Sequence, residues 1–156
     1  MKSCVFAGTF DPFSNGHLDV AVRAAKMFDS VIIAVSDSAE KKPMFPLADR
    51  AEMARLACAD IKNVRVMTFA GLLVDFLREN KVNYLVRGLR TSIDFEYENT
   101  LFEVYKSQMP EIECAFFMAK GKHIQGAFIR ELISFGGDFS SYVQKNVKKY
   151  IESKKI

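Results

Sequence analysis

Short apolar runs alternate with amphipathic stretches from one end of the chain to the other. Five runs are apolar over several consecutive residues, which is typical of strands buried on both faces of a parallel sheet. The predicted strands are Lys2–Phe6, Ser30–Ser36, Val64–Phe69, a strand containing Tyr84–Val86, and Cys114–Met118. The pattern therefore predicts buried strands separated by longer segments.

The stretches between these strands have apolar residues three or four positions apart, as amphipathic helices do. One face of a predicted helix Gly16–Phe28 carries Leu18, Ala21, Val22, Ala25 and Phe28. The next predicted helices are Leu47–Ala59 and a short one through Leu72–Leu77 that ends near Asn80. A longer helix starts at about Ser92 and is expected to turn Ile93, Tyr97, Leu101 and Val104 inward. The last two are a helix around Phe128–Ile133, which stops at Gly136 and Gly137, and a helix through Val143–Ile151.

This alternation of strands and helices predicts a single α/β domain over residues 1–156, Rossmann-like and doubly wound, with a five-stranded parallel sheet. No internal repeat, low-complexity segment or flexible linker interrupts the pattern. In such sheets a ligand binds beyond the carboxyl ends of the strands, where the strand order reverses. The loops expected at that edge are residues 7–15, 37–46, 70–71, 87–90 and 119–125.

Composition narrows the class of protein. The chain has 156 residues, 49% of them hydrophobic and 26% charged, as in an ordinary globular domain. Its net charge of +3 is too small to indicate a nucleic-acid-binding protein. Cys4, Cys58 and Cys114 fall in apolar segments at wide spacings, so we expect reduced core residues. With no signal peptide and no apolar run of membrane-spanning length, we expect a cytoplasmic protein without a membrane partner.

The segment Ala7–His17, AGTFDPFSNGH, is the strongest candidate site. It joins the first strand to the first helix and contains two glycines, which let a backbone approach a ligand closely. A helix N-terminus presents free N–H groups and the positive end of the helix dipole, which suits a phosphate. Thr9 and Ser14 add hydroxyls, and His17 lies in the first helical turn. On its glycines alone, the segment could equally be an ordinary strand-to-helix turn.

Polar residues near this segment and after the second strand have two interpretations. Lys41 and Lys42 are either a solvated pair or a contact for a phosphate, which a lysine reaches as a point charge. Asp11 precedes Pro12, and an aspartate at such a turn commonly accepts hydrogen bonds from its own backbone. We therefore expect a structural rather than a catalytic role for Asp11.

The segment RGLR, residues 87–90, follows the fourth strand. Guanidinium groups bind phosphate in a bidentate manner, and a glycine between two arginines lets the backbone come close. Arg90 has an alternative role as the partner of Asp94 on the next helix. Arg87 has no acidic neighbour in the sequence, which favours a role in binding.

The string GTFDPFSNGH, residues 8–17, resembles the nucleotidylyltransferase signature, in which GTFDP is followed by His or Thr, any residue, Gly and His. Ser14 stands at the His-or-Thr position, and His17 supplies the final histidine. Together with KKPMF (41–45), RGLR (87–90) and DFEYE (94–98), it resembles the bacterial phosphopantetheine adenylyltransferases. The resemblance runs from about Val5 to Leu101 and continues more weakly to the C-terminus.

This resemblance implies transfer of AMP from ATP to 4′-phosphopantetheine, giving dephospho-CoA and pyrophosphate in coenzyme A biosynthesis. The acceptor phosphate would attack in line, without a covalent intermediate. The resemblance further implies Mg²⁺ carried by the ATP phosphates, a homohexamer, and CoA as a feedback ligand. Two alternatives stay open: another phosphate acceptor such as nicotinate mononucleotide, or a catalytically weak protein that binds nucleotide or CoA.

The resemblance also implies roles for individual residues. The catalytic residues would be His17, Lys41 and Arg87. The ATP site would contain Thr9, Phe10, His17, Gly88, Leu89, Arg90, Glu98, Gly121, Lys122, His123, Ile124, Gln125, Gly126 and Ala127. The acceptor site would contain Thr9, Lys41, Leu73, Arg87 and Glu131.

The chain departs from that family at two places. Gln125-Gly126-Ala127 stands where the family usually has serines or threonine, so three hydroxyls are missing. Either the ATP site works with backbone N–H groups and lysines, or ATP binding is weaker, since a lost hydrogen bond to a charged group costs about 1.5–3 kcal/mol. Val104-Tyr105 stands where Met-Asn is common, which alters the pocket expected for the pantetheine arm.

Overall fold

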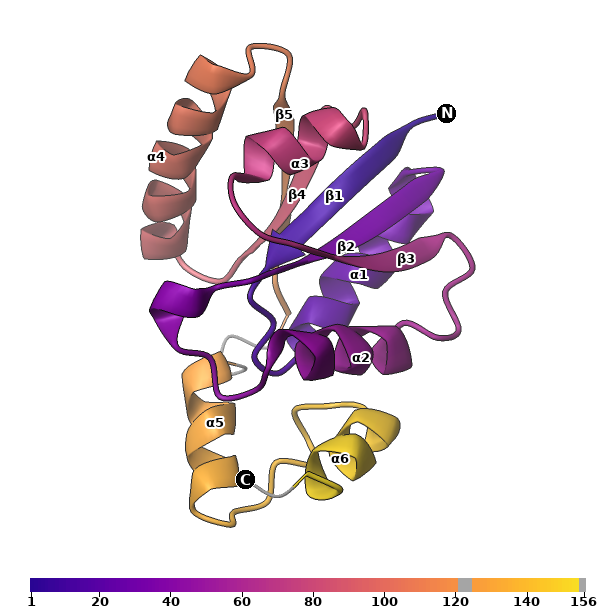
Figure 1. Cartoon of the computed structure of the whole chain (residues 1–156), viewed down its shortest axis with the longest axis vertical. Helices are drawn as coiled ribbons and strands as arrows, with labels where there is room; N and C mark the ends of the chain where they lie inside the picture. Colours follow the sequence, from indigo (N-terminus) through magenta and orange to yellow (C-terminus); the bar gives the residue numbers. More distant parts are fainter. Residues whose placement is uncertain (121–124, 155–156) are drawn as a thin grey trace.

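One sheet of five parallel strands forms the centre of the computed structural model, which describes residues 1–120 and 125–154 (Figure 1). The strands are β1 (Ser3–Gly8), β2 (Ser30–Ser36), β3 (Val64–Phe69), β4 (Tyr84–Leu89) and β5 (Glu113–Met118). Their order across the sheet is β3-β2-β1-β4-β5. The order reverses between β1 and β4, because the chain runs outward to β3 and then crosses back. The predicted α/β fold is confirmed, and its expected ligand edge lies between β1 and β4.

Both faces of the sheet are buried. Successive side chains of a strand point to opposite faces. Cys4 and Phe6 of β1 belong to one apolar cluster, and Val5 and Ala7 belong to the other. Val5 lies opposite residues of β2 and β4 in a parallel register, so the central strand is paired on both sides. This double burial explains why the strands are almost continuously apolar.

Helices cover each face in pairs. The face that carries Cys4 and Phe6 packs against α1 (Asn15–Met27) and α2 (Leu47–Ala57). The opposite face packs against α3 (Leu73–Glu79) and α4 (Ser92–Gln108). The 3-10 helix η1 (Ala39–Lys41) and α5 (Gly126–Ser134) lie beyond the carboxyl edge of the sheet (Figure 1). These two elements therefore sit where the fold predicts a ligand.

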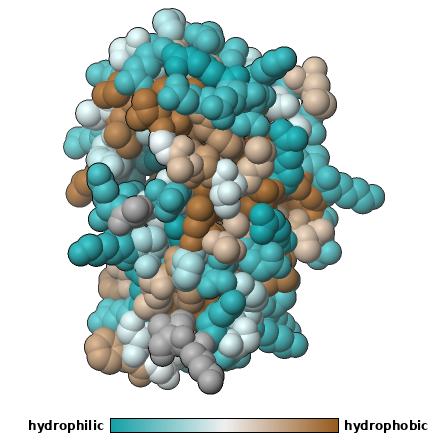
Figure 2. Space-filling model, in the orientation of Figure 1, coloured by the Kyte–Doolittle hydropathy of each residue, from teal (hydrophilic) through white to brown (hydrophobic). Residues whose placement is uncertain are grey.

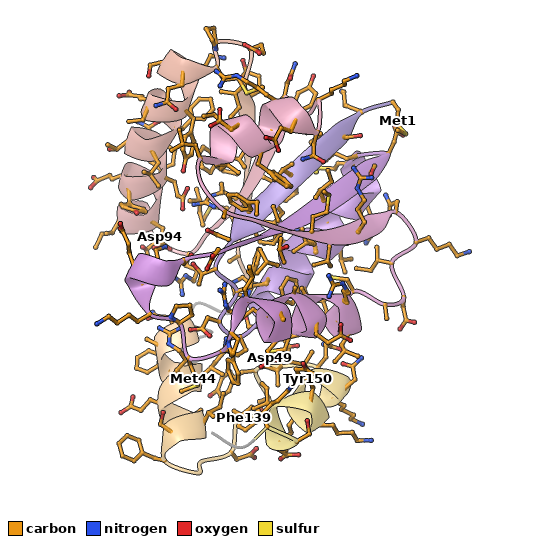
Figure 3. All side chains as sticks on the ribbon, viewed as in Figure 1. Met1, Met44, Asp49, Asp94, Phe139 and Tyr150 are labelled. Carbon is orange, nitrogen blue, oxygen red and sulfur yellow. The ribbon has the colours of Figure 1, made fainter. Side chains whose placement is uncertain are left out.

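The last helix, α6 (Lys145–Glu152), packs against α2 rather than against the sheet. Val147 and Ile151 are buried in the same apolar cluster as α1 and α2. The Tyr150 hydroxyl donates to Asp49 Oδ1 across 2.7 Å, and Figure 3 shows these two side chains between the helices. Lys154 Nζ lies 2.9 Å from the same carboxylate oxygen. Lys148 and Lys149 thus belong to a helix held onto α2.

The predicted orientation of α4 is wrong. Ile93, Tyr97 and Val104, expected to face inward, are 75%, 61% and 49% exposed, and α4 has no fully buried residue. The face that packs against the sheet instead carries Phe102 and Tyr105. The spacing of apolar residues identifies an apolar face of a helix, but it does not show whether that face packs against the core. Here the stripe stays on the surface, and hydrophobic residues are visible over the α4 region in Figure 2.

β4 is longer than predicted. Residues 87–90 were expected in a loop, but the ladder continues, with Gly88 opposite Phe117 and Leu89 opposite Met118. The remaining strands and helices lie close to their predicted bounds. Arg87 is therefore held in the sheet itself, and its side chain starts from a rigid strand.

The three cysteines form no disulfide bond. Cys4, Cys58 and Cys114 are free, as expected, and burial raises the pKa of each thiol to about 12. These thiols are therefore protonated and unreactive at neutral pH. Over residues 1–120 and 125–154, no helix has the length and apolar character needed to cross a membrane.

Candidate active site

A cleft of about 770 Å³ opens at the carboxyl edge of the sheet, around the ends of β1 and β4. Its walls come from the turn after β1, the segment after β2, the start of α3, α4 and the start of α5. The predicted site residues that line it are Thr9, Phe10, His17, Lys41, Leu73, Arg87, Gly88, Arg90, Glu98 and Gly126. The fold thus gathers residues from distant segments into one cleft.

His17 is held at the start of α1 by a reciprocal cap. The main-chain N–H of Ser14 donates to His17 Nδ1 across 2.9 Å, and Ser14 Oγ accepts from the His17 N–H across 3.4 Å. A backbone nitrogen can only donate, so Nδ1 accepts and the proton of the neutral ring is on Nε2. Ser14, which replaces the family's His or Thr, therefore orients the histidine.

The surroundings of His17 keep its ring neutral. Burial lowers the pKa of the imidazole to about 4, and the positive charge of Arg90 contributes in the same direction. The ring makes an edge contact with Phe10, with centroids 4.9 Å apart, and a tilted contact with Phe13 at 5.4 Å. At neutral pH the ring can therefore donate one N–H to a ligand without carrying a charge.

Arg87 has a partner that sequence proximity did not reveal. Its Nε donates to Glu98 Oε2 across 2.7 Å and its Nη2 to Glu98 Oε1 across 3.0 Å, while Nη1 donates to the Ala7 carbonyl across 2.6 Å. Burial alone would lower the pKa of Arg87, but the hydrogen bonds and charge of Glu98 outweigh it and raise that pKa. The two predicted site residues form one rigid pair that joins β4 to α4.

Arg90 makes the ion pair that the sequence offered as its alternative role. Its Nε lies 3.5 Å from Asp94 Oδ2, and the same oxygen accepts from the Arg90 N–H across 2.9 Å. Asp94 also completes the cap of α4 with Thr91. Arg90 nevertheless lines the cleft, so the ion pair holds its guanidinium there.

Thr9 and Lys41 face the cleft from opposite loops. The Thr9 hydroxyl lies 3.1 Å from the Ser38 hydroxyl, which links the turn after β1 to the segment after β2. Lys41 ends η1, and among the described residues its ammonium group has no ion-pair or hydrogen-bond partner. A cation without an acidic partner is available to an anionic ligand.

The prediction that Asp11 accepts hydrogen bonds from the backbone of its own turn is wrong. Its carboxylate accepts from the main-chain N–H of Met44 across 2.8 Å and of Phe45 across 3.0 Å, 33 and 34 residues along the chain. The loop after β2 folds over the turn after β1 and brings these amides to Asp11. The carboxylate therefore anchors a second loop of the cleft rather than its own turn.

Two arginines at the cleft were missed: Arg130 lines it, and Arg50 is buried beneath it. Arg50 of α2 is buried and bonds to three main-chain carbonyls. Arg130 of α5 donates to the Asp11 carbonyl across 2.9 Å, and a Cβ on Gly126 would lie 2.8 Å from its Nη1. Gly126 thus leaves the space that Arg130 occupies. The signal for Arg50 was a charged residue on an otherwise apolar helix face; no comparable signal marked Arg130.

The remaining predicted residues do not line the cleft or are not described. Leu89 is buried at the end of β4, and Gln125 and Ala127 are exposed. Glu131 is exposed in a separate groove beside Phe128 and Phe135, because a residue five positions after Gly126 lies about 140° around the helix. The predicted residues outside the described part of the chain are Gly121, Lys122, His123 and Ile124.

Comparisons with known proteins agree with this geometry. A family model described as cytidylyltransferase-like matches residues 5–131. Phosphopantetheine adenylyltransferases of Campylobacter jejuni subsp. jejuni serotype O:23/36 (strain 81-176) and of subsp. doylei (strain ATCC BAA-1458 / RM4099 / 269.97) are each 42% identical over 152 residues, 96% of this chain and 96% of theirs.

A solved structure shows the same fold at lower sequence identity. The putative nicotinate-nucleotide adenylyltransferase from Vibrio parahaemolyticus superposes with a TM-score of 0.76 and 19% identity, covering 97% of this chain and 93% of that one. The family model and the near-full-length relatives show that the chain belongs to the cytidylyltransferase-like family and, within it, to the phosphopantetheine adenylyltransferases.

Proposed function

We propose that this protein transfers AMP from ATP to 4′-phosphopantetheine and releases dephospho-CoA and pyrophosphate. The observation that carries the proposal is the 42% identity to phosphopantetheine adenylyltransferases over almost the whole chain. The cleft supports it, because the N-terminus of α1, with the neutral His17, opens into the same cleft as Lys41 and Arg87. The experiment is release of pyrophosphate from Mg²⁺-ATP with either 4′-phosphopantetheine or nicotinate mononucleotide as acceptor.

The reaction needs positioning more than proton transfer. An oxygen of the acceptor phosphate, already anionic, forms a bond to the α-phosphorus, and the bond to the bridging oxygen of the β-phosphate breaks. Pyrophosphate leaves with that electron pair, so no general base is required. Thr9, Lys41 and Arg87 would hold the acceptor phosphate against the repulsion of ATP. The rigid Arg87–Glu98 pair supports this role, since it fixes the guanidinium before substrate arrives.

His17 would stabilise the charge that develops on the transferring phosphate. Its Nε2–H is the only N–H group of the neutral ring, and Nδ1 already accepts a hydrogen bond from Ser14. A donor fixed in this way costs no reorganisation during the reaction. The N–H groups of the first turn of α1 add to the same field.

The rest of the cleft would divide between the two substrates. Gly88, Arg90 and the start of α5 would contact ATP, and Arg130 would bring a guanidinium where the family's serines are absent. Leu73 and Tyr105 would line the pantetheine arm on the side of α3 and α4. Tyr105 is half-buried, and its pKa is raised chiefly by burial, so the phenol is a neutral donor at pH 7.

Mg²⁺ would arrive on the ATP phosphates and neutralise part of their charge. Over residues 1–120 and 125–154, no cluster of three or more His, Cys, Asp or Glu side chains could hold a metal ion. The described residues therefore offer no carboxylate-rich set of ligands for a metal ion bound by the protein alone.

We further propose that the protein works in the cytoplasm as a homohexamer and binds CoA as a feedback ligand. The exposed apolar face of α4, with Ile93, Tyr97 and Val104, supports an assembly that covers it. The three reduced cysteines fit a reducing compartment. The mass of the particle in solution, measured by light scattering, tests the hexamer.

Because Gln125-Gly126-Ala127 replaces the family's serines, the pyrophosphate assay has a second possible outcome. A protein that binds ATP and CoA in calorimetry but releases no pyrophosphate would be a catalytically weak binding protein. Turnover with nicotinate mononucleotide alone would reassign the acceptor.

A further inference from the structure

Arg50 is buried beneath the acceptor end of the cleft. Its side chain is 1% exposed although it lies on α2, whose other buried positions are apolar. Nη1 donates to the Thr9 carbonyl across 2.7 Å and to the Ser36 carbonyl across 2.8 Å. Nε donates to the Phe45 carbonyl across 2.9 Å. One guanidinium therefore joins the turn after β1, the end of β2 and the end of the loop that carries Lys41.

Asp11 completes this arrangement from the opposite side. Its two carboxylate oxygens accept hydrogen bonds from the main-chain N–H groups of Met44 and Phe45, while Arg50 donates to the Phe45 carbonyl. The backbone at Phe45 is thus fixed through both its N–H and its carbonyl group. The loop of residues 37–46 has both its ends tied to the floor of the cleft: Arg50 binds Ser36 just before it and Phe45 near its end.

The charge of Arg50 needs an explanation beyond packing. Among the described residues, no carboxylate lies within ion-pair distance of the guanidinium, although Asp11 and Asp37 attract it at longer range. A buried charge without a close counter-ion carries a large desolvation penalty. What it provides is a planar fork that can satisfy carbonyls of three separate segments at once.

We propose that Arg50 is a positioning residue for the acceptor phosphate. It fixes the distance between Thr9 and the loop that carries Lys41, and so shapes the subsite between them. The inference rests on the proposed function and concerns only the acceptor half of the cleft. The hydrogen bonds of Arg50 go to the carbonyls of Thr9, Ser36 and Phe45, which belong to the segments that flank the proposed acceptor subsite.

The test is Arg50→Lys, which keeps the positive charge but cannot span three carbonyls. Because a misplacement of about 1 Å can cost 10²-fold, we expect the KM for 4′-phosphopantetheine to rise about tenfold or more, and the KM for ATP to change less than about threefold. Calorimetry with each substrate alone checks the same split in binding. The matched control is Arg55→Lys on the same helix, whose arginine is half exposed and pairs only with Glu52.

An equal change in both KM values, or no change in either, would overturn the proposal. Thermal unfolding shows whether the variant folds. If Arg50→Lys does not fold, Asp11→Asn, which loosens the same loop at Met44 and Phe45, must raise the acceptor KM beyond any change in Arg130→Met, because Arg130 Nε also lies 4.0 Å from Asp11 Oδ2. A wild type that turns over a different phosphate acceptor refutes the proposed function but leaves the Arg50 proposal testable with that acceptor. A wild type that binds no acceptor refutes both.

Discussion

The main-chain N–H of Ser14 donates to Nδ1 of His17 across 2.9 Å, and this bond decides which ring nitrogen can face a phosphate. The serine hydroxyl caps the same helix from the other side. The turn after β1 therefore does two things at once: it starts α1, and it presents a neutral Nε2–H donor to the cleft. The proposed chemistry depends on that donor.

Replacing His17 should abolish most of the activity and little of the stability. His17→Ala removes the donor to the transferring phosphate, and loss of such a donor lowers kcat by about 10²–10³-fold. Steady-state kinetics and a thermal melt of the same sample make the comparison. Near-normal kcat would refute the role assigned to His17.

Ser14→Ala is the matched variant for His17. It removes the hydroxyl, which caps α1 and lies 3.1 Å from Nδ1, but keeps the main-chain N–H that donates to Nδ1. We expect the free energy of unfolding to fall by about 1 kcal/mol, with kcat much closer to wild type than in His17→Ala. If both variants lose activity equally, the orienting bond is not the main-chain one.

His17 should titrate far below an ordinary histidine. Its pKa is lowered from 6.5 to about 4, chiefly by burial. As pH falls below 6.5 the unfolded chain takes up the proton first, so the free energy of unfolding decreases between pH 6.5 and 4. NMR of the ring protons, assigned with His17→Asn, measures the pKa directly. A midpoint near 6.5 would contradict a buried, neutral ring.

Glu98→Gln should loosen Arg87. The variant loses a charged acceptor for two hydrogen bonds of the guanidinium, each worth about 1.5–3 kcal/mol. We expect lower stability and a higher KM for the acceptor. Glu103→Gln, on an exposed position of the same helix, is the control and should change neither. An unchanged acceptor KM in Glu98→Gln would show that Arg87 does not bind that substrate.

Gly126 and Arg130 should behave as a coupled pair. A Cβ at position 126 would lie 2.8 Å from Arg130 Nη1, so Gly126→Ala must displace the guanidinium from the Asp11 carbonyl. We expect the KM for ATP to rise several-fold, as in Arg130→Met, with little further rise in the double variant. Ser134→Ala, at an exposed position at the other end of α5, is the control. Additive effects in the double variant would show that the two residues act independently.

The exposed stripe of α4 should be an interface. Ile93→Lys and Val104→Glu place charges on it without touching the cleft lining. We expect each to reduce the particle mass measured by light scattering while the monomer stays folded by circular dichroism. A wild type that is monomeric at micromolar concentration would contradict the proposed hexamer.

The sequence predicts the fold well because burial on both faces leaves a clear pattern. The central strands are apolar over most of their length, the edge strand β3 alternates, and GTFDPFSNGH marks the turn that the cleft is built on. Contacts between distant segments leave no such pattern. Glu98 is 11 residues from Arg87, and Asp11 is 33 from Met44, so neither pairing could be inferred from spacing. The α4 stripe was assigned to the core because periodicity does not distinguish a core face from an assembly face.

The most direct test follows the α-phosphate itself. ATP labelled at the α-phosphate is incubated with the protein, Mg²⁺ and 4′-phosphopantetheine, and the products are separated. The account predicts that the label appears in dephospho-CoA, with unlabelled pyrophosphate released in equal amount. Label that stays in ATP, or that moves only when nicotinate mononucleotide is the acceptor, would contradict the proposed function.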